Sequence, residues 1–292
     1  MSEPAALDDP LRTPPENPDE PPRAAFRWAS LPSAIRRFMP QSWAQLITIT
    51  IAIVSLAISL ITSQSQTQRQ LRQQLTDTLD RRMAITLEIQ KLNVERLTTT
   101  DLQLASALQN DLGILGAQDY ALIAHAADIA RQIPDEVEWM DYSILANGFA
   151  LAGDLENAER YYLETIGAVP SDFAEQWARN GYAWFLYSQP ARIEDGRAQY
   201  EAIITLINRI QVDEELRRSY LVNAYKSWAQ SEANIGNLER VDEVLQRGCE
   251  VATSSEMARV RDALTFDLNQ LWTLVYQFFG AGRAPQCEVG SG

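Results

Sequence analysis

The run LITITIAIVSLAISLI at residues 46–61 constrains what this chain can fold into more than any other stretch, because it contains no charged residue. It lies within a wider uncharged span, residues 38–68. A membrane-spanning helix needs about 20 mostly apolar residues to cross about 30 Å of hydrocarbon. Residues 43–63 supply that length. We therefore predict a single transmembrane helix at residues 44–63.

Two alternatives would also explain an apolar run. A cleaved signal peptide lies close to the amino terminus and ends in a small-residue cleavage site, whereas this run begins only at residue 46 and no such site follows it. A buried core helix would normally carry a polar stripe, which is missing here. The membrane interpretation fits better than either alternative.

The orientation in the membrane is less constrained, because arginines flank both ends of the apolar run. They are Arg23, Arg27, Arg36 and Arg37 before it and Arg69, Arg72, Arg81 and Arg82 after it. We expect the short amino-terminal tail to stay inside and the large carboxy-terminal domain to be exported.

The amino-terminal segment, residues 1–43, is predicted to be a disordered tail. Residues 1–40 hold nine of the thirteen prolines, interleaved with acidic residues. Proline removes a backbone donor and fixes φ, so neither helix nor sheet propagates through such a segment.

Residues 64–103 follow the membrane segment and are predicted to form a helical stalk, since residues 64–100 contain neither glycine nor proline. Apolar and small residues recur at heptad spacing, at Leu71, Thr78, Ile85 and Leu92 and, in a second register, at Leu75 and Ile89. The second register also places Arg82 and Arg96 in the seam. We therefore expect only a weak coiled coil, packed on the chain itself or on a sister chain in a homo-oligomer.

From residue 139 the chain reads WMDYSILANGFALAGDLENAERYYLETIGAVPSD. This stretch resembles a tetratricopeptide repeat, a helix–turn–helix unit of about 34 residues with aromatic, alanine, glycine and proline residues at fixed spacing. The matching residues are Tyr142, Leu145, Ala146, Phe149, Gly153, Asp154, Ala158, Tyr162 and Pro170. In this family the small residues let two helices touch, and the glycine permits the tight reversal between them.

One such unit does not bury its apolar faces alone, so the resemblance implies neighbouring units. A second is indicated by Trp177, Gly181, Trp184 and Ala198, and a third by Tyr225, Trp228, Ala229, Gly236, Asn237 and Leu245, with Glu232 and Val241 departing from the pattern. A faint further unit covers residues 104–137. We expect an all-α fold in which residues 104–279 form a repeat solenoid of three to four helical hairpins, with a plain bundle of hairpins as the alternative.

The last predicted helix, residues 257–279, closes the stack. Val260, Leu264, Leu268, Leu271, Val275 and Phe278 are predicted to share its packed side, and Trp272, Leu274 and Phe279 to remain available for contact with a partner. Residues 280–292 are predicted to be a flexible tail.

Neither composition nor motifs indicate an enzyme or a nucleic-acid-binding protein. The 25 basic and 39 acidic residues give a formal charge of -14, which repels phosphates. His125 is the only histidine, and the chain has no catalytic, cofactor-binding or metal-binding motif. Cys249 and Cys287 either form a disulfide, if the domain lies outside the cytoplasm, or remain two separate thiols.

The tetratricopeptide resemblance implies that the first helix of each unit lines a groove for an extended or helical peptide. In the third unit Asn223, Lys226, Gln230 and Asn234 share one helix face. Asn147 occupies the equivalent face of the first unit, and Tyr182 and Phe185 are expected to add aromatic surface in the second. We expect a membrane-anchored scaffold that binds a protein or peptide partner there; the alternative is a structural membrane organiser that only self-associates.

Overall fold

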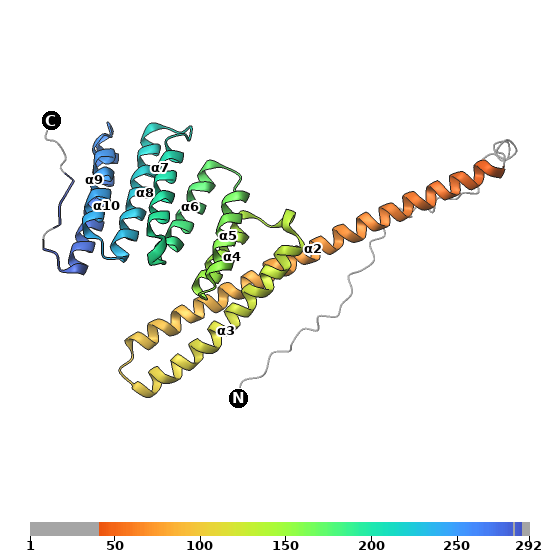
Figure 1. The fold of residues 1–292 in the computed structure, drawn as a ribbon, viewed down its shortest axis with the longest axis horizontal. Coiled ribbons are helices and arrows are strands. Elements are labelled where there is room, and N and C mark those ends of the chain that lie inside the picture. The colour runs from red at the N-terminus through yellow and green to blue at the C-terminus, as the bar shows by residue number, and fades with distance from the viewer. Residues whose placement is uncertain (1–40, 283, 288–292) are drawn as a thin grey trace, which may run out of the picture. The chain divides into compact units, whose positions relative to one another are not determined.

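The structure, a computed structural model, describes residues 41–282 and 284–287, and no strand occurs among them. The predicted all-α fold is thereby confirmed. The predicted tail at residues 1–40 lies outside the described residues, as do residues 288–292. The chain divides into two units, the first ending at Ser63 and the second running from Gln64. The helices are α2 (Gln41–Thr98), α3 (Leu102–Gln132), α4 (Trp139–Leu151), α5 (Leu155–Ala168), α6 (Asp172–Tyr187), α7 (Ile193–Ile207), α8 (Glu214–Asn234), α9 (Leu238–Thr253) and α10 (Ala258–Phe279), with short 3-10 turns η2 (Pro134–Glu136) and η3 (Pro190–Arg192) (Figure 1).

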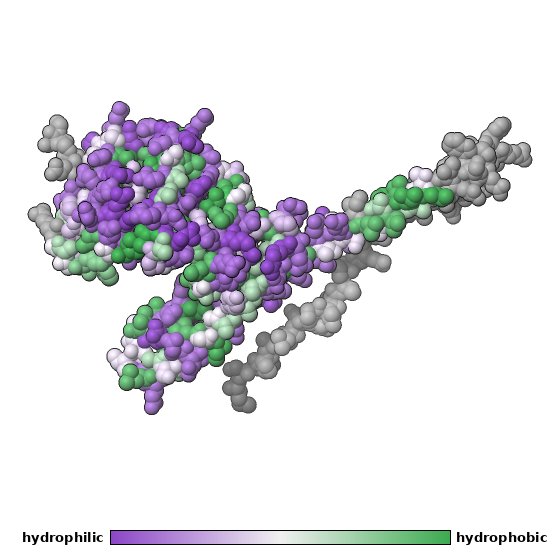
Figure 2. Space-filling view, viewed as in Figure 1, coloured by the Kyte–Doolittle hydropathy of each residue, from purple (hydrophilic) through white to green (hydrophobic). Residues whose placement is uncertain are grey.

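The first unit contains the apolar part of α2, which is long and apolar enough to cross a membrane. Its most apolar window has a mean hydropathy of 1.5, and none of that window is buried. Hydrophobic side chains cover this stretch of the helix in Figure 2. A core helix of a soluble domain would be mostly covered by other protein elements, whereas this window is exposed. The Thr62 hydroxyl donates to the Ile58 carbonyl at 2.8 Å, which satisfies a polar group within the helix itself.

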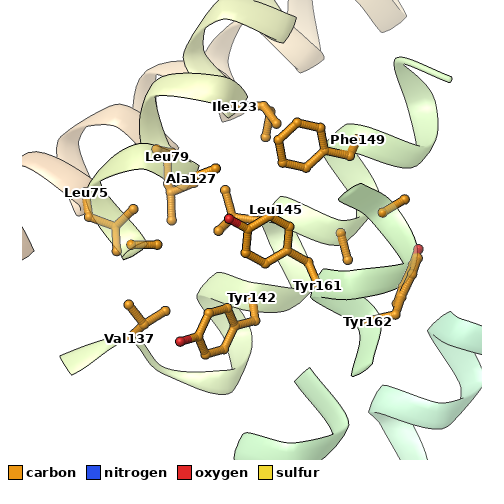
Figure 3. Packing of buried hydrophobic residues seen from close by; sticks show 14 of the residues in the cluster. Leu75, Leu79, Ile123, Ala127, Val137, Tyr142, Leu145, Phe149, Tyr161 and Tyr162 are labelled. Atoms are coloured by element: carbon orange, nitrogen blue, oxygen red, sulfur yellow. The ribbon is translucent and has the colours of Figure 1, made fainter. Parts of the chain in front are cut away.

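The second unit begins with the remainder of α2, which packs on the chain's own α3 and α4. Leu75 and Leu79 are buried in a cluster with Ile123 of α3 and Leu145 of α4 (Figure 3). Arg82, which interrupts the predicted heptad seam, is also buried, and its Nε lies 3.2 Å from Asp119 Oδ1. The inner stripe of the predicted stalk is therefore occupied by intramolecular packing.

Consecutive helices then pack against each other in pairs, α4 with α5, α6 with α7 and α8 with α9. Gly153 and Gly236, at the reversals within the first and third pairs, have φ of 79° and 78°, a left-handed conformation that favours glycine. The residues after them, Asp154 and Asn237, accept hydrogen bonds from the backbone of the next helix and so cap its N-terminus. The sequence pattern located both reversals.

The second pair has a different register from the predicted one. Trp177, Trp184 and Ala198, which indicated the second unit, are all exposed. The close approach of α6 and α7 is made instead at Gly196, where an added Cβ would lie 2.6 Å from the Tyr187 ring. The spacing of aromatic residues predicted the wrong register because α6 carries aromatic residues on both of its faces. Helical spacing alone does not show which of the two faces is buried.

A substitution at Ala158 tests this packing. Ala158 is fully buried between α4 and α5, so Ala158→Leu should overpack the pair and cost about 1–3 kcal/mol of the free energy of unfolding. Ala198→Leu in α7, on an exposed surface, should change it by less than about 0.5 kcal/mol. Chemical denaturation of the segment from residue 64 onward measures both, and equal effects would contradict the assigned register.

Each helix pair contacts the next element through hydrogen bonds of one charged side chain. This charged residue lies in the second helix of the pair, directly after a buried residue. Glu159, after Ala158, accepts hydrogen bonds from Tyr182 and Arg192. Arg197, after Gly196, donates two to Glu232. In α9, Asp242 accepts from the Trp272 indole at 2.7 Å and the Tyr276 hydroxyl at 2.6 Å. The next residue of a helix lies about 100° round its axis, which turns each charge toward the neighbouring element.

The last helix, α10, packs on α8 and α9, but its faces differ from the predicted ones. Leu268 and Val275 are buried as expected, whereas Phe278 is 84% exposed. Trp272 is only 1% exposed and is not available for contact with a partner. The indole is held inward because Asp242 accepts its N–H.

Cys249 of α9 and Cys287 form a disulfide, with their Cα atoms 5.3 Å apart. The backbone N–H of Cys287 donates to Asn269 Oδ1 of α10 at 2.8 Å. The tail predicted to be flexible from residue 280 is therefore attached to the domain at residue 287. Of the two alternatives predicted for the cysteines, a disulfide or two separate thiols, the structure contains the disulfide.

Candidate partner-binding groove

The predicted polar face of α8 exists and is accessible. Asn223, Gln230 and Asn234 are exposed and Lys226 is half-buried. They lie on one side of the helix because the opposite side, with Trp228, is buried against the neighbouring helices. The spacing of three and four residues thus places these four side chains along a single surface.

The facing wall comes from α6, where a second stripe of exposed and half-buried residues runs along the helix. Phe173, Trp177, Asn180 and Trp184 recur every three or four residues. Trp177 is 60% exposed. The Phe173 ring lies 5.4 Å, centroid to centroid, from the ring of Tyr220 on α8, and this contact closes one end of the surface between the two helices.

The two walls enclose a groove with a volume of about 390 Å³, which we call the α6–α8 groove. Its lining residues are Phe173, Gln176, Trp177, Asn180, Ile203, Tyr220, Asn223, Ala224, Lys226, Ser227 and Gln230. Three of the predicted partner-binding residues are therefore brought together with aromatic and amide side chains.

The α6–α8 groove is nearly neutral although the chain is acidic. Among the described residues that line it, Lys226 is the only charged one. The Lys226 Nζ lies 3.0 Å from Asp267 Oδ2 of α10. This partly exposed ion pair adds little to stability, but it leaves no uncompensated charge in the groove. The remaining polar lining groups are side-chain amides and hydroxyls.

One of these amides has an unused hydrogen-bonding atom. The Gln176 Oε1 atom is buried and accepts no hydrogen bond from another group in the structure. A buried acceptor without a donor costs about 1–3 kcal/mol. Because this oxygen is buried, the cost falls on the fold, and Gln176 contributes to the groove only as a lining residue.

A second hollow continues from the first at Gln230, which lines both. It has a volume of about 680 Å³ and is mostly apolar, with Leu274, Val275, Phe278 and Phe279 of α10 on one side. Asn234, another predicted partner-binding residue, lies on its α8 side. The two hollows therefore form adjoining parts of one surface. The α6–α8 groove is polar and aromatic, and the second hollow, next to α10, is mostly apolar.

A larger hollow of about 810 Å³ lies between α2, α3 and the reversal from α4 to α5. Its carboxylates are already engaged, because Asp119 pairs with Arg82 and Asp154 caps α5. Tyr120 is its only aromatic lining residue. Amides line both hollows, but the α6–α8 groove has three aromatic lining residues, Phe173, Trp177 and Tyr220. Aromatic anchors favour recognition of a peptide, so we give the α6–α8 groove preference over this larger hollow.

Tyr182 and Phe185 do not contribute the aromatic surface expected of them. They are 6% and 4% exposed, and both pack against Tyr162 in the core. Burial, followed by the hydrogen bond to Glu159, raises the pKa of Tyr182 to about 12. Both residues are structural because they lie on the face of α6 that turns toward α5.

Asn147 lies apart from both hollows of the α6–α8 surface. It is exposed on α4, and its Oδ1 accepts a hydrogen bond from the Tyr162 hydroxyl at 2.9 Å. Sequence reasoning missed Phe173, Gln176, Asn180 and Tyr220. The recurrence of Phe173, Trp177, Asn180 and Trp184 every three or four residues could have indicated the α6 wall, but only Trp177 and Trp184 were considered, as part of the repeat pattern.

No family model matches the chain, and no similar curated protein or solved structure was found. Among the described residues no group of three or more histidine, cysteine, aspartate or glutamate side chains is arranged to hold a metal ion. The function is therefore argued from the α6–α8 groove and from the membrane segment.

Proposed function

We propose that this chain is a single-pass membrane-anchored scaffold that binds a peptide segment of a protein partner in the α6–α8 groove. The observation that carries the proposal is the juxtaposition of exposed Trp177 with the amides of Asn223 and Gln230. Exposed aromatic side chains anchor partners, and amides supply orientation without a charge that must be neutralised. The tetratricopeptide resemblance of residues 139–172 supports the same reading, since that family uses its first helices for binding peptides.

The anchor is the apolar part of α2, and we propose that the carboxy-terminal domain is exported. Support comes from the disulfide between Cys249 and Cys287, because disulfides persist in oxidising compartments and are rare in the cytosol. In this arrangement the groove faces partners outside the cytoplasm.

Capture of partners from solubilised membranes by the full chain tests the proposed groove. Trp177→Ala/Gln230→Ala should abolish capture, because it removes the aromatic anchor and an amide of the groove. The matched control is Phe266→Ala/Gln246→Ala, which removes one exposed aromatic and one exposed glutamine elsewhere. Loss of the same partners in both variants, or in neither, would contradict binding in the groove.

A self-associating membrane organiser is the second candidate, and one observation favours it. Met83, Leu87, Val94 and Leu97 form an exposed apolar stripe at heptad spacing on α2. If this stripe is the functional surface, the segment from residue 64 onward should form a closed oligomer in solution without any partner. A monomeric mass for that segment favours the scaffold.

A further inference from the structure

The α6–α8 groove has a chemistry specific enough to name the class of peptide that it takes. We infer that it binds an uncharged, proline-containing segment in the polyproline II conformation. This inference rests on the proposed function and adds the identity of the ligand class. Three features of the groove support the inference: its amide side chains, its aromatic rings and its lack of uncompensated charge.

The amides indicate an extended backbone. Amide side chains line the space between α6 and α8 on both walls, Gln176 and Asn180 from α6 and Asn223 and Gln230 from α8, and the two on α8 are exposed. A bound helix has already paired its backbone groups and would leave these amides without partners. A polyproline II segment has no internal hydrogen bonds, so its carbonyls accept from the amide NH2 groups.

The aromatic rings indicate proline. Phe173, Trp177 and Tyr220 present ring surface at the groove, and Trp177 is the most exposed of the three. Proline-rich segments dock in aromatic-lined grooves because their conformation is already fixed, so little entropy is lost on binding. Addition of a β-strand is the other common way to bind an extended peptide, and it requires a sheet edge, which the described helices do not offer.

The charge balance indicates an uncharged segment. Lys226 is already paired with Asp267, so a carboxylate on the ligand would have to displace that partner. A basic ligand residue would find no carboxylate among the lining residues in the described part of the chain. Bringing an unpaired charge out of water into such a site is unfavourable. Neutral side chains between the prolines therefore fit best.

A panel of fluorescently labelled synthetic peptides tests the inference on the full chain in detergent. The probes are an alternating alanine–proline peptide, a glycine–serine peptide of equal length, an alanine-rich helical peptide, and alternating glutamate–proline and lysine–proline peptides. Fluorescence anisotropy should give a Kd for the alanine–proline peptide at least about tenfold below that of every other probe. Since no charge is involved, that Kd should hardly change with salt concentration.

The groove variants locate the binding and separate this inference from the proposed function. Trp177→Ala/Gln230→Ala should raise the Kd of the alanine–proline peptide at least about tenfold, and Phe266→Ala/Gln246→Ala should leave it unchanged. Tightest binding of the helical peptide or of a charged peptide would overturn the inference. If Trp177→Ala/Gln230→Ala abolishes partner capture while the alanine–proline peptide never binds, the proposed function stands and the ligand class is wrong. If the peptide binds as expected but capture is unaffected by the variant, the ligand class stands and the proposed function is wrong.

Discussion

Replacing Glu232 with alanine should lower the free energy of unfolding by about 3–5 kcal/mol, because it leaves the largely buried Arg197 guanidinium without its buried counter-charge. The Glu232 side chain is 0% exposed. It accepts hydrogen bonds from Arg197 Nε and Nη2, each at 2.7 Å, from the Tyr187 hydroxyl at 2.7 Å and from the Trp228 indole at 3.1 Å. Chemical denaturation of the segment from residue 64 onward, a compact unit, measures the loss.

The matched control is Glu194→Ala, which removes a carboxylate from the same arginine. The Glu194 side chain is 82% exposed where it pairs with Arg197, and exposed ion pairs contribute about 0–1 kcal/mol. A large loss for Glu232→Ala beside a small loss for Glu194→Ala is expected. Similar losses would mean that the buried network linking the second and third helix pairs is not a major stabilising contact.

The same network predicts how stability depends on pH. Burial alone would raise the pKa of Glu232, but hydrogen bonds from Arg197, Tyr187 and Trp228 outweigh burial and hold the pKa below its ordinary value of 4.5. A lowered folded-state pKa adds stability that is complete above the unfolded-state pKa and is lost as the pH falls through the folded-state pKa. The difference in unfolding free energy between the native chain and Glu232→Gln should therefore be constant near neutral pH and shrink in acid. A pH-independent difference would contradict this assignment.

Reduction of the disulfide between Cys249 and Cys287 should lower the free energy of unfolding by about 3–4 kcal/mol, because the closed loop restricts the unfolded chain. The two cysteines are 38 positions apart. Thermal or chemical unfolding with and without reductant measures the effect. The control is Cys249→Ser/Cys287→Ser, on which reductant should have no effect. Equal stability of the native chain in both conditions would show that the bond contributes nothing.

The disulfide also makes the proposed orientation testable in intact cells. If the carboxy-terminal domain is exported, a membrane-impermeant reductant followed by a membrane-impermeant maleimide should label both cysteines. The double serine variant provides the background. Labelling that appears only after the cells are permeabilised would place the domain in the cytoplasm and contradict export.

Local features of the sequence were sufficient for the secondary structure and for one wall of the groove. The apolar run at residues 46–61 predicts an exposed apolar helix because no charge or polar stripe interrupts it. Gly153 and Gly236 locate two reversals because glycine tolerates positive φ. The polar residues of α8 share a face because helical periodicity depends only on spacing. These properties involve residues near one another in the chain.

The tertiary structure decided which face of each helix turns inward and which distant groups meet. Two faces of α6 carry aromatic residues, one with Phe173 and Trp177 and the other with Tyr182 and Phe185. The second face is the buried one because it packs against α5. In the sequence, Glu232 is only a departure from the repeat pattern. In the structure it accepts a hydrogen bond from Arg197, which lies 35 positions earlier in the chain. The facing wall of the groove and the disulfide partner of Cys249 depend in the same way on contacts between separate helices. Periodicity determines which residues share a face, whereas burial of that face depends on the neighbours that the fold places against it.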